Sequence, residues 1–116
     1  MSGYQPARGD FVFVNLDPRT GVELGKRRPA LVVSGTRFNT ATGMAVMCPV
    51  TNTEAMSVFD VAIPEDSKLS GFVVSAQVRA IDWIARGVSF HSRASRETLD
   101  EVTARLEAVL GLGPDA

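Results

Sequence analysis

Short apolar runs rich in β-branched and aromatic residues, separated by turn-forming residues, recur along most of the chain. They occupy residues 11–16, 30–34, 44–50, 58–63, 72–75 and 77–83, and residues 84–90 could add one more. Such residues favour strands because they pack well on a pleated surface. The connections at 36–43 and 64–71 have the composition of turns. Strands at roughly ten-residue spacing are typical of a small barrel or sandwich, so a mainly β domain is predicted.

The C-terminal part of the chain has a different period. Its apolar residues recur at helical spacing and form one stripe, made of Leu99, Val102, Leu106, Val109 and Leu110. Ser95 is suited to cap the start of this helix, and Gly111 ends it. We therefore predict an α+β fold in which a curled antiparallel sheet of about six to seven strands packs against one C-terminal helix.

The composition is that of a single globular domain. Of the 116 residues, 45% are hydrophobic and 22% are charged, which is enough for one core without disulfides. No apolar run approaches the roughly 18 residues of a membrane-spanning helix, and the first residues hold no signal-peptide core. The single cysteine, Cys48, cannot form an internal disulfide. We expect one domain over residues 1–116, in the reducing cytoplasm and without membrane contact.

Charges are sorted along the chain although the net charge is only −1. Residues 1–37 carry six cations and three acids, whereas residues 96–116 carry two cations and five acids. Ten of the twelve basic residues are arginine, the side chain suited to bidentate phosphate contacts and to stacking on bases. A general electrostatic coat for nucleic acid is excluded by the net charge, but a local anion site is allowed.

A long loop and several strand ends supply the candidate site. Residues 18–28 have no periodicity, and a loop of about ten residues without secondary structure is often functional. The loop ends in three cations directly before an apolar run: Lys26, Arg27 and Arg28. Loops at one rim of a small barrel converge, so one shared site could collect the polar residues at the strand ends, which are Glu23, Arg28, Thr51, Gln77, Arg79 and Asp82.

Several other chemistries lack support in the sequence. The chain has no glycine-rich phosphate-binding motif. One histidine and one cysteine cannot supply a zinc site without several carboxylates. We interpret His91, between Phe90 and Ser92, as a surface or cap residue. No metal and no cofactor are therefore expected.

A series of short motifs follows in order along the chain: Gly9-Asp10, Asp17-Pro18, Gly21-x-Glu23, Arg28-Pro29-Ala30-Leu31-Val32-Val33, Asn39, Gly43-Met44, Pro49-x-Thr51, Gln77-Val78-Arg79-Ala80-Ile81-Asp82-Trp83 and Ala85-Arg86-Gly87. In this order and spacing they resemble the MazF/PemK (Kid) family of toxin endoribonucleases. The resemblance extends from Tyr4 to Leu110, which sets the core of the domain at about 4–110 and leaves 111–116 as a short polar tail.

The resemblance implies a fold and a function. Proteins of this family are SH3-like barrels with a C-terminal helix, and they work as homodimers. They cleave single-stranded RNA, chiefly messenger RNA, at short sequence motifs without a metal. An antitoxin protein neutralises them by placing an acidic, extended tail in the RNA groove. The chain is thus expected to be the toxin of a toxin–antitoxin module, leaving a 2′,3′-cyclic phosphate or 3′-phosphate and a 5′-OH.

The resemblance also implies roles for single residues. We expect Arg28 to stabilise the phosphorane, Thr51 to position the phosphate or the 2′-OH, and Glu23 to act as the general base. Further catalytic or RNA-binding candidates are Arg79, Asp82, Gln77 and Asn39, of which Arg79 with Asp82 is the pair that competes with Glu23. Candidates for steering the RNA phosphates are Lys26, Arg27 and Arg86.

Structural roles compete with these hypotheses. Arg28 could hold the loop through a carboxylate such as Glu23. Thr51 could be a turn hydroxyl that bonds its own backbone, and Gln77 could satisfy buried backbone groups. Two other functions also stay open: a toxin of the same barrel type that binds DNA gyrase without cutting, and a module that binds RNA without cleaving it. The recognition sequence and the identity of the antitoxin are not encoded in these patterns.

Overall fold

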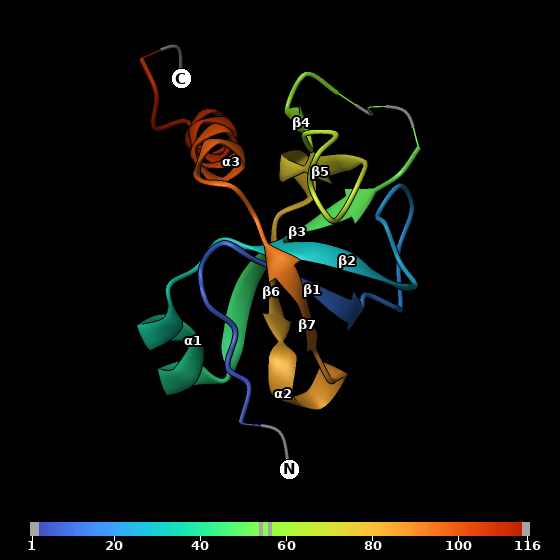
Figure 1. Ribbon diagram of the computed structural model, residues 1–116, viewed down its shortest axis with the longest axis vertical. Coiled ribbons are helices and arrows are strands. Elements are labelled where there is room, and N and C mark those ends of the chain that lie inside the picture. The colour runs from blue at the N-terminus through green and yellow to red at the C-terminus, as the bar shows by residue number, and fades with distance from the viewer. Residues whose placement is uncertain (1–2, 54, 56, 115–116) are drawn as a thin grey trace.

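A computed structural model describes residues 3–53, 55 and 57–114 of the chain (Figure 1). Within this part the elements follow in the order β1 (Asp10–Asn15), β2 (Arg27–Val32), α1 (Thr36–Thr42), β3 (Met44–Thr51), β4 (Asp60–Ala62), β5 (Phe72–Val74), a 3₁₀ turn η1 (Ser75–Gln77), β6 (Arg79–Asp82), α2 (Trp83–Arg86), β7 (Ser89–Arg93) and α3 (Arg96–Val109). Across the described ranges, no helix has the length and apolar character that crossing a membrane requires.

All strand pairs are antiparallel, and β3 is the strand that joins the sheet together. The main path of the sheet is β4-β5-β3-β2-β1-β7, and β6 pairs with β3 beside this path. One edge of β3 serves two strands because residues 44–47 pair with β6, whereas Val50 and Thr51 pair with β5. Among the described strands β6 and β7 do not pair, so the curled sheet is open. The predicted antiparallel strands and C-terminal helix are confirmed, but the barrel is not closed.

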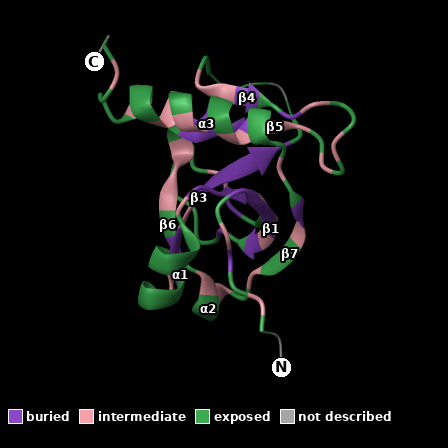
Figure 2. Ribbon diagram, turned by 60° about the vertical axis from the view of Figure 1, so that its left-hand side comes forward, coloured by how far each residue is buried: buried purple, intermediate pink, exposed green. Residues whose placement is uncertain are grey.

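The central strands β1, β2 and β3 are buried on both faces, which explains their near-continuous apolar runs. Phe11 and Leu31 belong to a cluster on the side of α3, where Val102 of the helix is fully buried. Their neighbours Val12 and Val32 point to the opposite face and fill the inside of the curl. Figure 2 shows the buried strands at the centre and the exposed residues of α1, α2 and α3 outside.

The helix α3 follows its sequence signals. The Ser95 hydroxyl accepts a hydrogen bond from the Thr98 N–H at 3.1 Å, so the predicted N-cap is confirmed. After the helix, Leu110 and Leu112 are 64% and 72% exposed. Leu110, which was predicted to belong to the apolar stripe, therefore lies exposed at the end of the helix, and the tail predicted as polar contains the exposed apolar Leu112. Residues 115–116 of the tail lie outside the described residues.

Three boundary predictions were wrong. Residues 36–43 form the helix α1 and not a turn, and Gly43 ends it in the left-handed conformation with φ 72°. Residues 84–90 hold the end of α2 and only the start of β7. β2 begins at Arg27, before the predicted start at residue 30, so the arginines lie in the strand. Helices as short as α1 and α2 depend on tertiary contacts more than on propensity, which explains why the sequence pattern did not show them.

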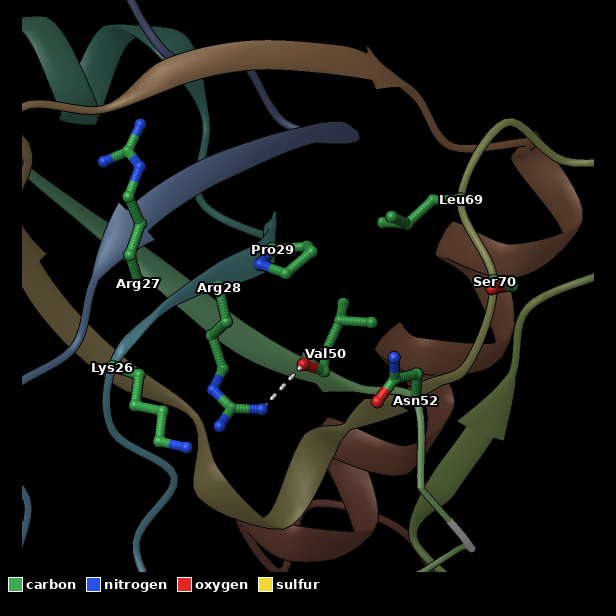
Figure 3. Close-up of a pocket in the computed structure, with 8 residues that line it drawn as sticks. All are labelled: Lys26, Arg27, Arg28, Pro29, Val50, Asn52, Leu69 and Ser70. Atoms are coloured by element: carbon green, nitrogen blue, oxygen red, sulfur yellow. Dashed lines mark hydrogen bonds between the residues drawn. The ribbon is translucent and has the colours of Figure 1, made fainter.

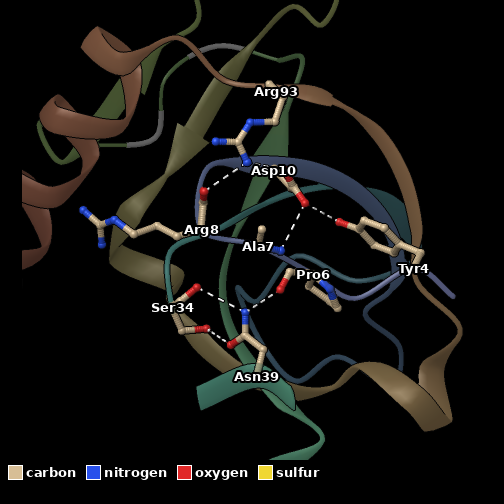
Figure 4. Close-up of polar contacts among 8 residues, drawn as sticks. All are labelled: Tyr4, Pro6, Ala7, Arg8, Asp10, Ser34, Asn39 and Arg93. Atoms are coloured by element: carbon tan, nitrogen blue, oxygen red, sulfur yellow. Dashed lines mark hydrogen bonds and ion pairs between the residues drawn. The ribbon is translucent and has the colours of Figure 1, made fainter. Parts of the chain in front are cut away.

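The start of β1 is tied to the chain before it through one buried carboxylate (Figure 4). Asp10 is 3% exposed and accepts hydrogen bonds from the Tyr4 hydroxyl at 2.6 Å and the Ala7 N–H at 3.1 Å. Arg93 of β7 forms an ion pair with the same carboxylate at 2.6 Å. Burial and the hydrogen bond to Asp10 raise the pKa of Tyr4. Asp10 therefore has a structural role.

A second buried polar group, Asn39 of α1, holds the same segment from below (Figure 4). Its side-chain NH₂ donates to the carbonyl oxygens of Pro6 at 2.9 Å and Ser34 at 3.2 Å, and its side-chain oxygen accepts from the Ser34 hydroxyl. The indole N–H of Trp83 donates to the Asn39 carbonyl at 3.0 Å. Asn39 has no solvent exposure, so α1 is positioned by this amide.

Replacing this amide should destabilise the fold. We expect Asn39→Ala to lower the free energy of unfolding by about 2 kcal/mol or more, because buried carbonyl oxygens would lose their donor. The neighbouring Thr40 is exposed on the same helix, and Thr40→Ala is the matched control. Urea denaturation measures both variants. Equal stability of the two would contradict the structural role of Asn39.

Candidate functional site: a cationic hollow beside the β1–β2 loop

A hollow of about 300 Å³ lies at the start of β2 (Figure 3). It is framed by β2, the end of β3 and the β4–β5 loop (residues 63–71), and its lining residues are Lys26, Arg27, Arg28, Pro29, Val50, Asn52, Leu69 and Ser70. Three of these residues are basic and none is acidic. We call it the Arg28 hollow. A concave surface with this charge favours an anionic ligand.

Arg28 bridges two backbone segments at the edge of this hollow. Its Nε donates to the carbonyl oxygen of Gly25 at 2.7 Å, and its Nη1 donates to that of Val50 at 3.3 Å. The side chain is thus held by carbonyl groups, and the hypothesis that a carboxylate such as Glu23 holds it does not fit. Carbonyl partners orient the guanidinium without neutralising it, so its positive charge stays available to a ligand.

The surroundings of Arg28 also lower the pKa of its guanidinium. Burial lowers the pKa of the guanidinium, and the nearby charge of Arg19 lowers it further, while Asp17 acts in the opposite direction. A guanidinium has five N–H donors, so the two bonds to carbonyl groups leave others to face an anion. Arg28 is therefore suited to bind a phosphate.

Thr51 does not line the hollow, although both of its neighbours, Val50 and Asn52, do. It is 3% exposed, and its hydroxyl bonds the Thr53 hydroxyl at 2.8 Å and accepts from the Thr53 N–H at 3.3 Å. This is the turn role that the sequence left open. At Gly71 a Cβ would collide with the Thr51 carbonyl, so only glycine lets the β4–β5 loop approach this closely. The turn presents Asn52 to the hollow, a residue that the sequence analysis missed although it directly follows Thr51.

Glu23 lies apart from Arg28, in a second hollow of about 310 Å³. The lining of this hollow is Val22, Glu23, Ala76, Gln77, Val78 and Arg79. The exposed carboxylate of Glu23 accepts a hydrogen bond from the Thr20 N–H at 3.0 Å within its own loop. The expected constellation is therefore divided, with Arg28 in one hollow and Glu23, Gln77 and Arg79 in the other.

Gln77 holds the β1–β2 loop (residues 16–26) to η1 through two hydrogen bonds, which we call the latch. Its side-chain oxygen accepts from the Leu24 N–H at 2.7 Å, and its side-chain NH₂ donates to the Val22 carbonyl at 3.1 Å. Arg79 of β6 donates to the Leu16 carbonyl at 2.9 Å, at the start of the same loop. Both side chains bond backbone groups, so the alternative that Gln77 satisfies the backbone is confirmed in this conformation.

The end of the β1–β2 loop makes a tight turn into β2. Lys26 has a φ of 65°, which a residue with a Cβ seldom adopts. Its N–H donates to the Asp17 carboxylate at 2.7 Å, so Asp17 holds this turn. A Cβ at Gly25 would collide with Asp17 and with Arg19. The Lys26 side chain lines the Arg28 hollow, so the conformation of this turn positions the ammonium group of Lys26 at the hollow.

The remaining candidates are divided among other contacts. Arg86 donates from α2 to the carbonyls of Asn15 at 3.0 Å and Asp17 at 2.5 Å, and thereby supports the β1–β2 loop. Asp82 caps α2, where its carboxylate accepts from an N–H at 2.9 Å. Asn39 is fully buried at α1 and lines neither hollow. Among the described residues, no group of three or more His, Cys, Asp or Glu side chains is placed to hold a metal ion.

Loss of the latch should open the β1–β2 loop. We expect Gln77→Ala to raise the rate of tryptic cleavage after Arg19 and Lys26 by about tenfold, because two hydrogen bonds that hold the loop are lost. Gln5→Ala, at an exposed position, is the matched control. Limited proteolysis followed by mass spectrometry measures both variants. Unchanged cleavage of Gln77→Ala would show that the latch does not restrain the loop.

Comparisons with known proteins point to one family. Residues 7–110 match the family model of the PemK-like, MazF-like toxin of type II toxin–antitoxin systems. The chain is 32% identical to the endoribonuclease toxin MazF of Escherichia coli strain K12, over 96% of this chain and 99% of the relative. It is 38% identical to the endoribonuclease toxin ChpB of the same strain, over 89% of this chain and 92% of the relative.

Solved structures agree with the sequence comparison. The crystal structure of MazF from Deinococcus radiodurans matches with a TM-score of 0.88 at 37% identity, over 93% of this chain and 98% of that one. A second structure from that organism, a MazE–MazF complex, matches with a TM-score of 0.82 at 33% identity, over 95% of this chain and 99% of that one. The chain, with its cationic hollow beside a latched loop, belongs to the family of PemK-like, MazF-like toxins of type II toxin–antitoxin systems.

Proposed function

We propose that the chain is a sequence-specific, metal-independent endoribonuclease that cleaves single-stranded messenger RNA. The observation that carries the proposal is the Arg28 hollow, which is cationic, has no acidic lining residue and contains an arginine held by carbonyl groups only. Membership of the toxin family and the name endoribonuclease of its relatives support the same activity.

The reaction follows from what Arg28 can do. The 2′-OH oxygen of the nucleotide attacks the adjacent phosphorus, and the bond from phosphorus to the 5′ oxygen breaks. The products are a 2′,3′-cyclic phosphate, which water opens to a 3′-phosphate, and a 5′-OH. Arg28 donates hydrogen bonds to the non-bridging oxygens, whose charge rises in the phosphorane. The leaving 5′ oxygen takes up a proton from solvent as its bond breaks, which balances the proton removed from the 2′-OH.

The other catalytic candidates act around Arg28. Thr51 positions the turn that carries Asn52 to the hollow, and its hydroxyl, which bonds Thr53 in the structure, is the group proposed to contact the phosphate or the 2′-OH. Glu23 is the preferred general base because it lies on the same loop as Gly25, the backbone partner of Arg28, whereas Asp82 lies at the start of α2. Both carboxylates accept a backbone N–H in the structure. The β1–β2 loop must shift on RNA binding to bring Glu23 toward the bound phosphate.

The proposed partners follow from the same surface. A cognate antitoxin with an acidic, extended tail would be attracted to the Arg28 hollow by its three basic residues. We further propose that the chain acts as a homodimer in the cytoplasm. The MazF relative from Deinococcus radiodurans has been solved as a MazE–MazF complex, which supports a protein partner for this chain.

The cleavage products test the proposed function directly. Purified protein free of antitoxin should cut a long single-stranded RNA at discrete sites in EDTA, and the new ends should carry 5′-OH and cyclic or 3′-phosphate groups. Primer extension and end-specific ligation map both ends and give the recognition sequence. A strict requirement for Mg²⁺ would contradict the 2′-OH mechanism. An RNA left intact by folded dimer would favour a binding-only or gyrase-binding toxin instead.

Arg28 should matter for the rate and not for the fold. We expect Arg28→Ala to lower the cleavage rate by roughly 10²-fold or more, by analogy with loss of one oxyanion donor. Arg28→Lys keeps the charge but not the paired donors, and should be intermediate. Arg37→Ala, at an exposed position of α1, is the matched control. Single-turnover kinetics measure the rates, and full activity of folded Arg28→Ala would remove Arg28 from the mechanism.

A further inference from the structure

Beside the Arg28 hollow, three side chains from neighbouring strands form a continuous row, which we call the stacking row: Arg27 of β2, Phe13 of β1 and His91 of β7. The guanidinium of Arg27 lies over the Phe13 ring, 5.9 Å from its centroid. The rings of Phe13 and His91 meet edge to face, with centroids 5.3 Å apart and an angle of 71°. The row thus presents three flat groups on the outer face of the sheet.

The members of this row are held in place by neighbours. Arg27 donates to the Ser89 hydroxyl at 3.0 Å. The Nδ1 atom of His91 and the hydroxyl of the buried Ser92 lie 2.7 Å apart in a hydrogen bond. Flat side chains that are already oriented lose little conformational entropy when a ligand stacks on them.

The row leads from the Arg28 hollow to another concave surface. This second surface, the β7 hollow, has a volume of about 460 Å³. It is lined by Asp66, Ser67, Lys68, Phe90, His91, Ser92, Arg93 and Ser95.

Two connections join the hollows. Consecutive residues of the β4–β5 loop wall both of them, since Ser67 and Lys68 face the β7 hollow and Leu69 and Ser70 face the Arg28 hollow. In addition Pro29, in the lining of the Arg28 hollow, is the cross-strand partner of Phe13. The stacking row therefore lies on the path from one hollow to the other.

The chemistry of this path fits a single strand of nucleic acid. Bases stack on aromatic rings and on guanidinium planes, while phosphates take the cations between them. The β7 hollow has the cations Lys68 and Arg93 against one acid, Asp66, and Arg93 already pairs with Asp10. The carboxylates of an acidic peptide could use these cations but not the flat groups, so the stacking row favours bases over carboxylates.

We propose that nucleotides flanking the one at Arg28 cross the stacking row and enter the β7 hollow, so that this face is an auxiliary RNA subsite. The inference rests on the proposed function, because it extends the strand whose phosphate lies at Arg28. The subsite strengthens binding of long RNA and takes no part in bond breaking.

The test measures how tightly the wild type and its variants bind a short and a long RNA. The probes are fluorescent random-sequence RNAs of about four and about 12 nucleotides, lengths that fit within one hollow or extend into the second. Their riboses carry 2′-O-methyl groups, so they cannot undergo 2′-OH attack during the measurement. Fluorescence anisotropy gives the dissociation constants of the wild type, of His91→Ala and of Phe13→Leu. Phe38→Leu, an aromatic residue of α1 that is 45% exposed, is the matched control.

Wild-type protein should bind the long RNA more tightly than the short one. We expect His91→Ala and Phe13→Leu to weaken binding of the long RNA by about tenfold, as loss of one stacked base predicts, and to leave the short RNA unaffected. Phe38→Leu should bind both like the wild type. Thermal unfolding shows whether Phe13→Leu is folded. If Phe13→Leu does not fold, His91→Ala alone tests the stacking row.

Three outcomes would overturn the inference. One is an equal loss for both RNA lengths, and another is no loss at all. The third is that the variants change only the oligomeric state or the affinity for an acidic peptide, which would assign the row to a protein partner. Failure of the wild type to cut RNA would instead refute the proposed function, and it is measured separately because these probes report binding without cleavage.

Discussion

The pairing of β3 with three other strands is the constraint on which the rest of the structure depends. Because one edge of β3 is shared by β6 and β5, the sheet must curl, and η1 between those two strands faces the β1–β2 loop. The other edge pairs with β2 and sets Val50 opposite the arginine end of that strand. The register of β2 against β3 thus places Arg28 beside the end of β3. The candidate site follows from strand pairing alone.

Arginine side chains at this rim bind carbonyl groups and not carboxylates. Arg28, Arg79 and Arg86 all donate to backbone oxygens of the β1–β2 loop or of its neighbours. A carbonyl satisfies the geometry of a guanidinium but leaves its charge uncompensated. The same bonds therefore order a long loop and keep the rim positive. A carboxylate partner would order the loop equally well but would compete with a phosphate for the guanidinium.

The sequence predicted the strands and α3 because their signals are local: apolar runs, a helical stripe, and Ser95 as a cap. It did not predict α1, whose position depends on the buried amide of Asn39, or the division between Arg28 and Glu23. Residue type identified Arg28 and Gln77 as important polar groups. Whether each would face a ligand or a backbone carbonyl is decided by tertiary contacts of the loop, which have no sequence period.

The latch at Gln77 and the properties of Arg28 are coupled through the β1–β2 loop. The loop supplies Gly25, which orients the guanidinium, and Arg19, whose charge lowers its pKa. If the loop opens, the guanidinium loses its bond to Gly25 and becomes more exposed, so both causes that lower its pKa weaken. Under the proposed function Glu23, on the same loop, would move toward the phosphate. Gln77 bonds the residues on both sides of Glu23, whereas Asp17 bonds Lys26 just after Gly25. A shift of Glu23 would therefore break the bonds to Gln77, while the bond to Asp17 could still hold Gly25 beside Arg28.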